Sequence, residues 1–339
     1  MSYRYSKIFA VACALMLALG CDRSASNSAG PTTKSSSGIK IGFIVKQPEA
    51  TWFRLEWQFA QQAADKYGFE LIKISGTDGE KVLSAIDNLA TSGAQGFVIC
   101  TPEVKLGPAI VTKAKTRGLK VLAVDDQFID ADGKPITDVP YLGISARKIG
   151  GSVGEALMAE MKRRNWPAAE TGVCVVTFEE VDTQRERTDG AIDSIKATGF
   201  PEGQIYKAPQ KTNDQPGALD TTLNLLTRAQ DVKRWLICGP NDDAVLGAVR
   251  AMENRGLNAD NIIGIGINGT ECIPEFEKPT RTGFFASSLL QAKEHGFKTA
   301  ELMYKWIKDG TEPPRDTRTI GVMINRDNFE QVLKEQGIR

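Results

Sequence analysis

The chain has 339 residues, 41% of them hydrophobic, and is long enough for two domains of about 150 residues each. Its 42 basic and 42 acidic side chains cancel at neutral pH, which excludes the strong positive field that recruits nucleic acid or an anionic membrane. This charge balance favours a neutral small molecule as the partner.

Residues 1–21 are predicted to be a signal peptide. Arg4 and Lys7 precede the apolar run IFAVACALMLAL, which is shorter than the roughly 20 apolar residues of a membrane helix. The following ALGC resembles the lipobox of bacterial lipoproteins, so two alternatives stay open: lipidation of Cys21, which would anchor the protein to the membrane, or cleavage a few residues later. Residues 22–38 are rich in Ser, Gly and Thr, which indicates a flexible tether.

From Lys40 onward, short apolar runs alternate with longer amphipathic stretches. The runs are IGFIV, FELIKI, GFVIC and VLAV, then VCVVTF, RWLIC, IIGIGI and RTGFFAS. The stretches between them, such as FRLEWQFAQQAADKY, have helical periodicity. Regular alternation of strand and helix indicates βαβ units and parallel sheets covered by helices on both faces. We therefore predict an α/β fold with two such sheets in succession.

The break between the two sheets is predicted near residues 139–145, VPYLGIS, where a short extended piece follows the turn-rich DADGKP. A helix over about 146–164 starts the second series, which runs to about residue 285. A long helix over 291–308 and a further strand, TRTIGVMI, come last. These late elements can return to the first domain and then to the second, which predicts several crossing strands and hence a hinge.

Polar side chains follow the predicted strands at their carboxyl ends, where open α/β sheets bind ligands. One aromatic residue stands at the start of the first helix. The residues selected in this way are Lys46, Trp52, Cys100, Asp125, Asp126, Thr183, Arg187, Asn241 and Asn268. Fixed polar groups and an aromatic ring on two facing domains indicate a cleft for a small molecule.

These side chains suit a sugar. Each ring hydroxyl both donates and accepts, so carboxylates, a guanidinium and amides can satisfy several of them, and the C–H face of the ring can cover an aromatic plane. Two carboxylates at the end of a buried strand need partners, because an unpaired buried carboxylate is costly. We expect hydroxyls to donate to Asp126, and Asp125 to meet Arg187, water or backbone. The alternative is that both aspartates cap the following turn.

Catalysis and cofactors are not predicted. GIGING, residues 264–269, fits GxGxxG, but its first two glycines alternate with isoleucine within a strand, which disfavours a dinucleotide. The only histidine, His295, is interpreted as a surface residue or a satisfied helix residue, so neither a metal site nor a Ser-His-Asp triad is predicted. Adjacent carboxylates on a strand point to opposite faces, whereas paired catalytic carboxylates must face one another across a bond.

Four cysteines follow the leader, and each lies in or at the end of an apolar stretch: Cys100, Cys174, Cys238 and Cys272. Burial as small hydrophobic side chains is the favoured interpretation. A disulfide between two of them stays open for an exported protein.

Five segments carry a resemblance that runs from about residue 39 to the C-terminus. They are KIGFIVKQPE with the nearby WF, the stretch from DGEK to GFVICTP, AVDDQF, DTQRERTDG and GIGING. Together they resemble the bacterial periplasmic sugar-binding proteins of the ribose/galactose class, and within that class the L-arabinose binders. The resemblance implies the type I periplasmic binding protein fold, with two Rossmann-like lobes joined by a three-segment hinge. The implied N-terminal lobe is 39–144 plus 290–319, and the implied C-terminal lobe is 145–289 plus 320–339.

The resemblance also implies a function. It is that of a monomeric binding protein in the periplasm, which closes over one monosaccharide, L-arabinose above others, and delivers it to the permease of an ABC importer. Another aldopyranose, such as galactose or fucose, stays open as the ligand, and so does a sensor that feeds a membrane kinase or chemoreceptor. A sugar-responsive repressor shares the fold but needs a DNA-binding headpiece before the first strand, where this chain has the predicted leader and tether.

Carried over position by position, the resemblance assigns roles to the selected residues. Lys46 would bond ring hydroxyls, Trp52 would stack on the sugar, and Asp126 would accept from the anomeric hydroxyl. Arg187 would contact the region of the ring oxygen. The remaining residues would hold hydroxyls from the second lobe, namely Asn241 and Asn268, or line and support the pocket, namely Asp125, Cys100 and Thr183.

Several positions depart from the L-arabinose binders. Ala50 stands where they have a sugar-contacting glutamate, so one charged hydrogen-bond partner is missing. Their pocket methionines correspond to Ile144 and Pro240, a leucine to Val181, and a supporting aspartate to Glu271. A lost bonding group can leave a hydroxyl unpaired at a cost of about 1–3 kcal/mol, or a water can fill the gap.

Overall fold

The computed structural model describes residues 38–339. The predicted signal peptide, the lipidation site Cys21 and nearly all of the predicted tether lie outside the described residues. Among residues 38–339, no helix combines the length and the apolar character that a membrane crossing requires.

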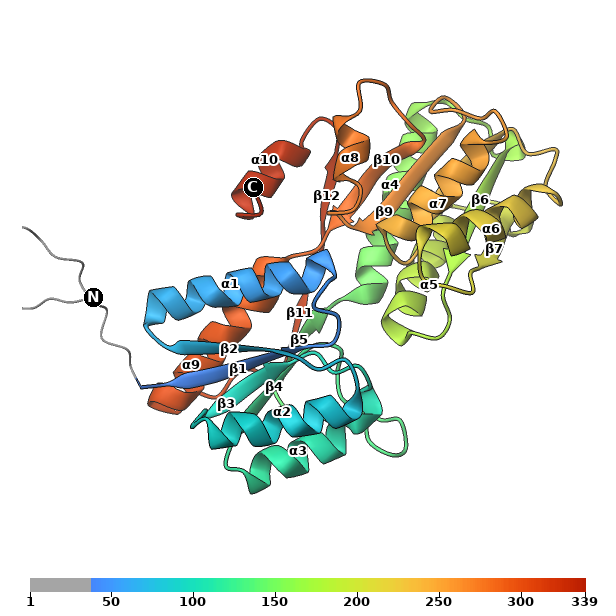
Figure 1. The fold of residues 1–339 in the computed structure, drawn as a ribbon. Coiled ribbons are helices and arrows are strands. Elements are labelled where there is room, and N and C mark those ends of the chain that lie inside the picture. The colour runs from blue at the N-terminus through green and yellow to red at the C-terminus, as the bar shows by residue number, and fades with distance from the viewer. Residues whose placement is uncertain (1–37) are drawn as a thin grey trace, which may run out of the picture. The chain divides into compact units, whose positions relative to one another are not determined.

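The first lobe is built on a six-stranded sheet in which every neighbouring pair of strands is parallel. Helices α1 (Thr51–Tyr67) and α9 (Thr299–Asp309) cover one face, and α2 (Gly79–Thr91) and α3 (Gly107–Thr116) cover the other (Figure 1). The strands, in spatial order, are β11 (Asp316–Thr319), β5 (Tyr141–Ile144), β4 (Lys120–Asp125), β3 (Gly96–Ile99), β1 (Lys40–Val45) and β2 (Glu70–Ser75).

The second lobe repeats this plan. Helices α4 (Ala146–Arg163) and α5 (Asp182–Ala197) cover one face, and α6 (Gln215–Leu226) and α7 (Asp242–Glu253) cover the other, with the short α8 (Ile273–Glu277) and α10 (Phe329–Glu335) beside them. The strands, in spatial order, are β12 (Val322–Asn325), β10 (Phe284–Leu289), β9 (Ile262–Asn268), β8 (Arg234–Cys238), β6 (Thr171–Thr177) and β7 (Ile205–Pro209). The predicted α/β class with two parallel-dominated sheets is confirmed.

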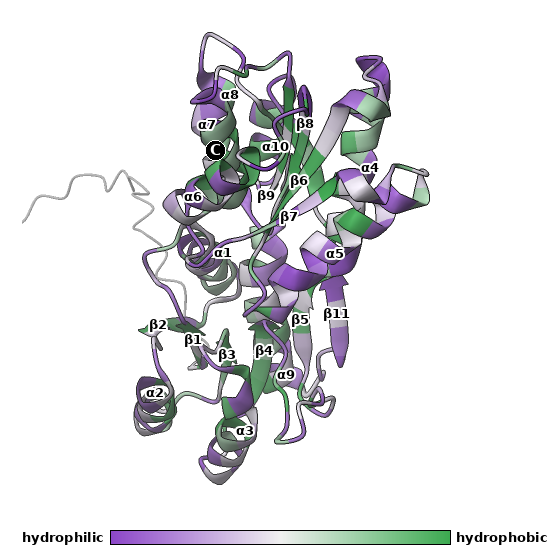
Figure 2. Cartoon of the chain, turned by 90° about the vertical axis from the view of Figure 1, so that its right-hand side faces the viewer, coloured by the Kyte–Doolittle hydropathy of each residue, from purple (hydrophilic) through white to green (hydrophobic). Residues whose placement is uncertain are grey.

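The central strands are buried on both faces because their apolar side chains alternate between two helical layers. Within β1, Ile44 packs in the cluster that contains α2 and α3, whereas Phe43 and Val45 pack in the cluster that contains α1 and α9. Each such side chain contributes roughly 1.5–3 kcal/mol when fully buried. Figure 2 shows the same distinction by hydropathy: the central strands β4 and β8 are hydrophobic, whereas the covering helix α5 is largely hydrophilic.

Three segments connect the two sheets, as the hinge prediction requires. The chain passes from β5 to α4, from β10 back to the first lobe through the π-helix η4 (Glu294–Lys298), and from β11 directly to β12. Short 3-10 turns lie at Val104–Leu106, Ala168–Glu170 and Glu202–Gln204.

The structure differs from the prediction at the last crossing. TRTIGVMI was expected to form one strand, but it forms the end of β11 and the start of β12, which belong to different sheets. Strand β12 is antiparallel to β10, the only antiparallel pair of named strands among the described residues. The reason is geometric: β11 ends at the same edge as its parallel neighbours, and the chain enters the second sheet after only two intervening residues. Strand β12 therefore starts at the edge where the parallel strands of the second sheet end, and it runs in the opposite direction to them.

The cysteines Cys100, Cys174, Cys238 and Cys272 are all buried and free. Their interpretation as small hydrophobic side chains is confirmed, and the alternative of a disulfide between two of them is wrong for this structure. Burial raises the pKa of each of these thiols, so they are neutral at physiological pH.

Candidate functional site

A cavity of about 270 Å³ lies among the carboxyl ends of strands from both sheets. Every predicted ligand residue except Cys100 lines it. Its lining consists of Lys46, Gln47, Ala50, Trp52, Phe53, Asp125, Asp126, Ile144, Val181, Thr183, Gln184, Arg187, Asn213, Asn241, Asp243, Asn268, Glu271 and Leu290. The size is at the small end for protein ligand sites, which suits a compact molecule.

Lys46 and Asp126 form an ion pair in the lining of the cavity. Lys46 follows β1, Asp126 follows β4, and the Lys46 ammonium donates to Asp126 Oδ2 at 2.5 Å. The two side chains retain only 26% and 14% of their exposure. Burial acts to lower the pKa of Lys46, but the carboxylates of Asp126 and Asp125 outweigh it, so the pKa lies above its ordinary value and the ammonium is charged. Lys46 is thus the protein partner of the buried Asp126 carboxylate.

Asp125 faces into the first lobe, where two donors hold it. His295 Nδ1 lies 2.6 Å from Oδ1, and Trp52 Nε1 donates to Oδ2 at 3.0 Å. The backbone at Asp125 is left-handed, with φ of 64°, and Tyr141 donates its hydroxyl to the Asp125 carbonyl at 2.6 Å. A non-glycine residue in this conformation stores strain that its surroundings must hold in place.

We expected the Asp125 side chain to meet Arg187, water or backbone, and this prediction was wrong, because its partners are His295 and Trp52. Arg187 is bound within the second lobe, and the positive φ at Asp125 aims the carboxylate at His295 and Trp52 instead. Burial raises the pKa of Asp125, but the bonds from His295 and Trp52 outweigh burial and lower it, so the carboxylate is ionised.

His295 is not a surface residue, because its side chain is fully buried. It is the satisfied helix residue that was the other interpretation, with Nδ1 facing Asp125 and Nε2 lying 2.9 Å from Thr319 Oγ1. Its ring meets Trp52 edge-on, with ring centroids 5.0 Å apart. His295 therefore supports the aromatic wall of the cavity from behind.

Cys100 lies behind the cavity and does not line it. Its side chain is fully buried, and its sulfur lies 3.7 Å from Asp126 Oδ2. A pleated strand alternates its side chains, so the residue just past β3 turns into the first lobe's core and supports Asp126 from below.

One cluster of acidic and histidine side chains has the composition of a metal site. Single ligand atoms of Glu56, Asp125 and His295 all lie within 4.8 Å of one another. The Asp125 oxygen and the His295 nitrogen, however, are only 2.6 Å apart, shorter than the roughly 3.4 Å that separates neighbouring ligands of a tetrahedral zinc ion with bonds near 2.1 Å. Asp125 and His295 are thus arranged as a hydrogen-bonded pair, with Glu56 beside them, rather than as two ligands of a metal centre.

Arg187 is the cation of the second lobe. It sits on α5, which packs so tightly on α4 that a Cβ at Gly150 would overlap the Arg187 carbonyl. Its Nη1 donates to the Pro240 carbonyl at 2.7 Å and lies 3.4 Å from Asn268 Oδ1, while its buried Nε has no partner among the described residues. Burial lowers the pKa of Arg187 to about 10, which leaves it charged at neutral pH. An orphaned donor beside a cavity is a group that a ligand can satisfy.

The two asparagines are held in different ways. Asn241 caps α7, accepting from the Ala244 amide at 2.9 Å and donating to Asn213 at 3.1 Å. Asn268 ends β9 with φ of 117°, and the next amide, that of Gly269, donates to the buried Asp242. Burial raises the pKa of Asp242 to about 7. The side-chain amides of Asn241 and Asn268 are thus both held in place by the protein before any ligand enters.

The polar residues that the prediction missed are Gln47, Gln184, Asn213 and Asp243. Asn213 follows β7, an edge strand whose sequence IYKAP lacks the continuous apolar run used to find the other strands. The feature that could have located Asn213 was its position shortly after a short, partly exposed strand. The apolar lining residues that were missed are Phe53 and Leu290. Of the positions that depart from the L-arabinose binders, Ala50, Ile144, Val181 and Glu271 line the cavity, whereas Pro240 contributes its carbonyl to Arg187.

Comparison with known protein families shows to which family the chain belongs. The family described as periplasmic binding proteins and sugar binding domain of LacI family matches residues 38–330. The chain belongs to this family. The predicted resemblance is confirmed by two of its relatives. The L-arabinose-binding periplasmic protein of Escherichia coli (strain K12) is 50% identical over 304 residues, which cover 89% of this chain and 92% of that protein.

The second relative of this family is the ABC transporter L-arabinose-binding periplasmic protein of Azospirillum brasilense. It is 45% identical over 306 residues, which cover 90% of this chain and 92% of that protein. Among solved structures, the periplasmic ribose ABC transporter from Conexibacter woesei superposes with a TM-score of 0.73 at 18% identity, covering 88% of this chain and 96% of that one. At such low identity this match bears on the fold alone, and it agrees with the type I periplasmic binding protein fold.

Proposed function

We propose that this protein binds L-arabinose in the periplasm and delivers it to an ABC importer. The observation that carries the proposal is the cavity itself, which offers a paired ammonium and carboxylate from one lobe, and a guanidinium with an orphaned N–H and two anchored amides from the other. The two L-arabinose-binding relatives, at 50% and 45% identity, support the choice of sugar.

The proposed mechanism is closure of the lobes over the sugar. Hydroxyl groups of the sugar donate to Asp126 and accept from Lys46, while Arg187 Nε donates to the sugar from the second lobe. The C–H face of the ring lies against Trp52. Contacts made from both lobes favour the closed state over the open one by differential affinity, and exclusion of water strengthens each hydrogen bond.

The location and the partners follow the same proposal. Export through the signal peptide predicted at residues 1–21 would bring the protein to the periplasm. Lipidation of Cys21, the monomeric state and the identity of the permease stay predictions. Transport rather than catalysis is proposed, because the relatives are named as binding proteins.

Isothermal titration calorimetry with a panel of pentoses and hexoses tests the function. We expect L-arabinose to bind with a micromolar or lower dissociation constant and to be recovered chemically unchanged. Tighter binding of galactose or fucose would keep the sugar-binding function and replace its ligand. An absence of binding to every aldopyranose would refute the proposal.

Ala50→Glu is expected to raise the affinity for L-arabinose by about tenfold, the size of one charge-assisted hydrogen bond. Ala50 lines the cavity at the N-cap position of α1, so a carboxylate there would face the sugar and would be favoured by the helix dipole. Calorimetry measures the effect, and Ala50→Gln, of the same size but uncharged, is the matched control. Equal affinities of the parent and the glutamate variant would show that this position does not limit binding.

A further inference from the structure

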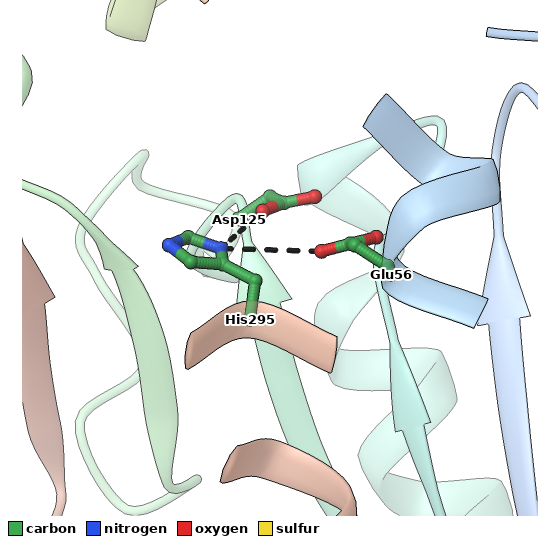
Figure 3. A group of neighbouring side chains, drawn as sticks. All are labelled: Glu56, Asp125 and His295. Atoms are coloured by element: carbon green, nitrogen blue, oxygen red, sulfur yellow. Dashed lines mark hydrogen bonds and ion pairs between the residues drawn. The ribbon is translucent and has the colours of Figure 1, made fainter. Parts of the chain in front are cut away.

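A fully buried glutamate stands behind the sugar site. Glu56, on α1, has no exposed surface, and neither of its carboxyl oxygens accepts a hydrogen bond from a donor among the described residues. Its Oε1 lies 3.9 Å from His295 Nδ1 (Figure 3). The side chain is directed at the place where His295 meets Asp125. A buried polar group without a partner is costly and calls for an explanation.

The fold itself brings Glu56 to this place. The π-helix η4 lies so close to α1 that a Cβ on Gly296 would overlap the backbone carbonyl of Glu56. Because Gly296 is adjacent to His295, this contact holds the backbone of α1 at Glu56 close to the backbone that carries His295. Backbone packing therefore places the two side chains within reach of one another.

The groups that face Glu56 are Asp125, Asp126 and Cys100 at the ends of two strands, Lys46 after β1, and His295 on η4. Burial raises the pKa of Glu56 well above its ordinary value, and the adjacent Asp125 raises it further, while Lys46 acts in the opposite direction. Asp125 is already an anion that accepts from His295 on one oxygen and from Trp52 on the other. A second anion beside it would be repelled, whereas a neutral carboxylic acid would bring a donor.

We propose that Glu56 is a positioning residue of the sugar site, a neutral carboxylic acid whose O–H donates a hydrogen bond to the Asp125 carboxylate. Together with His295 it holds the Asp125 carboxylate in the orientation that fixes the indole of Trp52. The inference rests on the proposed function, because Asp125 and Trp52 line the cavity assigned to the sugar. Loss of the Glu56 proton at high pH would place two anions side by side and would displace Asp125, and with it Trp52.

Calorimetric titration of L-arabinose between about pH 6 and pH 9 tests this proposal with three proteins, since this range lies above the ordinary glutamate pKa. The wild-type dissociation constant is expected to rise by about tenfold toward high pH. Glu56→Gln, whose amide donates as the acid does but never ionises, is expected to match the wild type at low pH to within about twofold and to stay unchanged with pH. Glu56→Leu fills the space without a donor and is expected to bind at least tenfold more weakly throughout.

The matched comparison isolates Glu56, because Glu56→Gln differs from the wild type only in a side chain that cannot ionise. Identical pH profiles for these two proteins, or wild-type affinity in Glu56→Leu, would overturn the positioning role. Should Glu56→Leu fail to fold, the comparison of the wild type with Glu56→Gln decides by itself. A wild-type protein that binds no sugar at any pH would count against the proposed function instead, so the two failures are distinguishable.

Discussion

Asp126→Asn is expected to raise the dissociation constant for L-arabinose by about 100-fold. Asp126 is both the partner of the Lys46 ammonium and the proposed acceptor for a sugar hydroxyl. A hydrogen bond to a charged group contributes about 1.5–3 kcal/mol, and an asparagine turns one acceptor oxygen into a donor that faces the ammonium. A loss of about 3 kcal/mol corresponds to about 100-fold in affinity at about 1.4 kcal/mol per tenfold.

Calorimetry at neutral pH measures this effect, and circular dichroism checks that the variant is folded. Asp132→Asn is the matched control, because Asp132 is an exposed aspartate in the turn that follows the same strand. Its affinity is expected to equal that of the wild type. Undiminished binding by a folded Asp126→Asn protein would remove Asp126 from the sugar site.

Arg187→Ala should weaken sugar binding by about 100-fold or more, and Arg187→Lys should restore little of the loss. Nη1 of the guanidinium donates to the Pro240 carbonyl, whereas the buried Nε has no partner among the described residues and is left to donate to the ligand. A lysine ammonium is a single point on a flexible stem, so it cannot make both contacts from one rigid plane. Losing one charged donor and leaving a sugar hydroxyl unpaired costs about 3 kcal/mol or more.

Two measurements separate binding from closure at this residue. Calorimetry gives the affinity, and small-angle X-ray scattering reports whether sugar still compacts the protein. Arg185→Lys is the matched control, since Arg185 lies on the same helix but bonds to Glu179 and Asp182 instead. Full rescue of both readouts by Arg187→Lys would show that the positive charge alone matters, in contradiction to the forked geometry proposed here.

The part of the site that lies in the first lobe shows how much a local sequence pattern can predict. VLAV followed by two aspartates indicated a buried strand with carboxylates at its carboxyl end, and β4 ends at Asp125 as that pattern requires. The same pattern could not tell which partner each aspartate would find. That depended on β1, which brings Lys46 to Asp126, and on η4, which reaches Asp125 from a point 170 residues further along the chain.

Glu56 and His295 show what was present in the sequence but not used. Glu56 stands four residues after Trp52 and three before Phe59, so it falls on the apolar face of α1 rather than on its solvent face. His295 stands four residues before Thr299 and eight before Met303, both buried. A charged residue at an apolar helical position is an unusual feature, and it marks the cluster that the structure reveals.

The order of strands and helices, the burial of the central strands and the placing of polar groups at strand ends were determined by the sequence alone, because each depends on the periodicity of a few neighbouring residues. The antiparallel β12, the Lys46–Asp126 pair and the network of Glu56, Asp125 and His295 were decided only by the tertiary structure. These features join segments that are far apart in the chain, and their geometry is set by how whole elements pack. No local pattern contains that information.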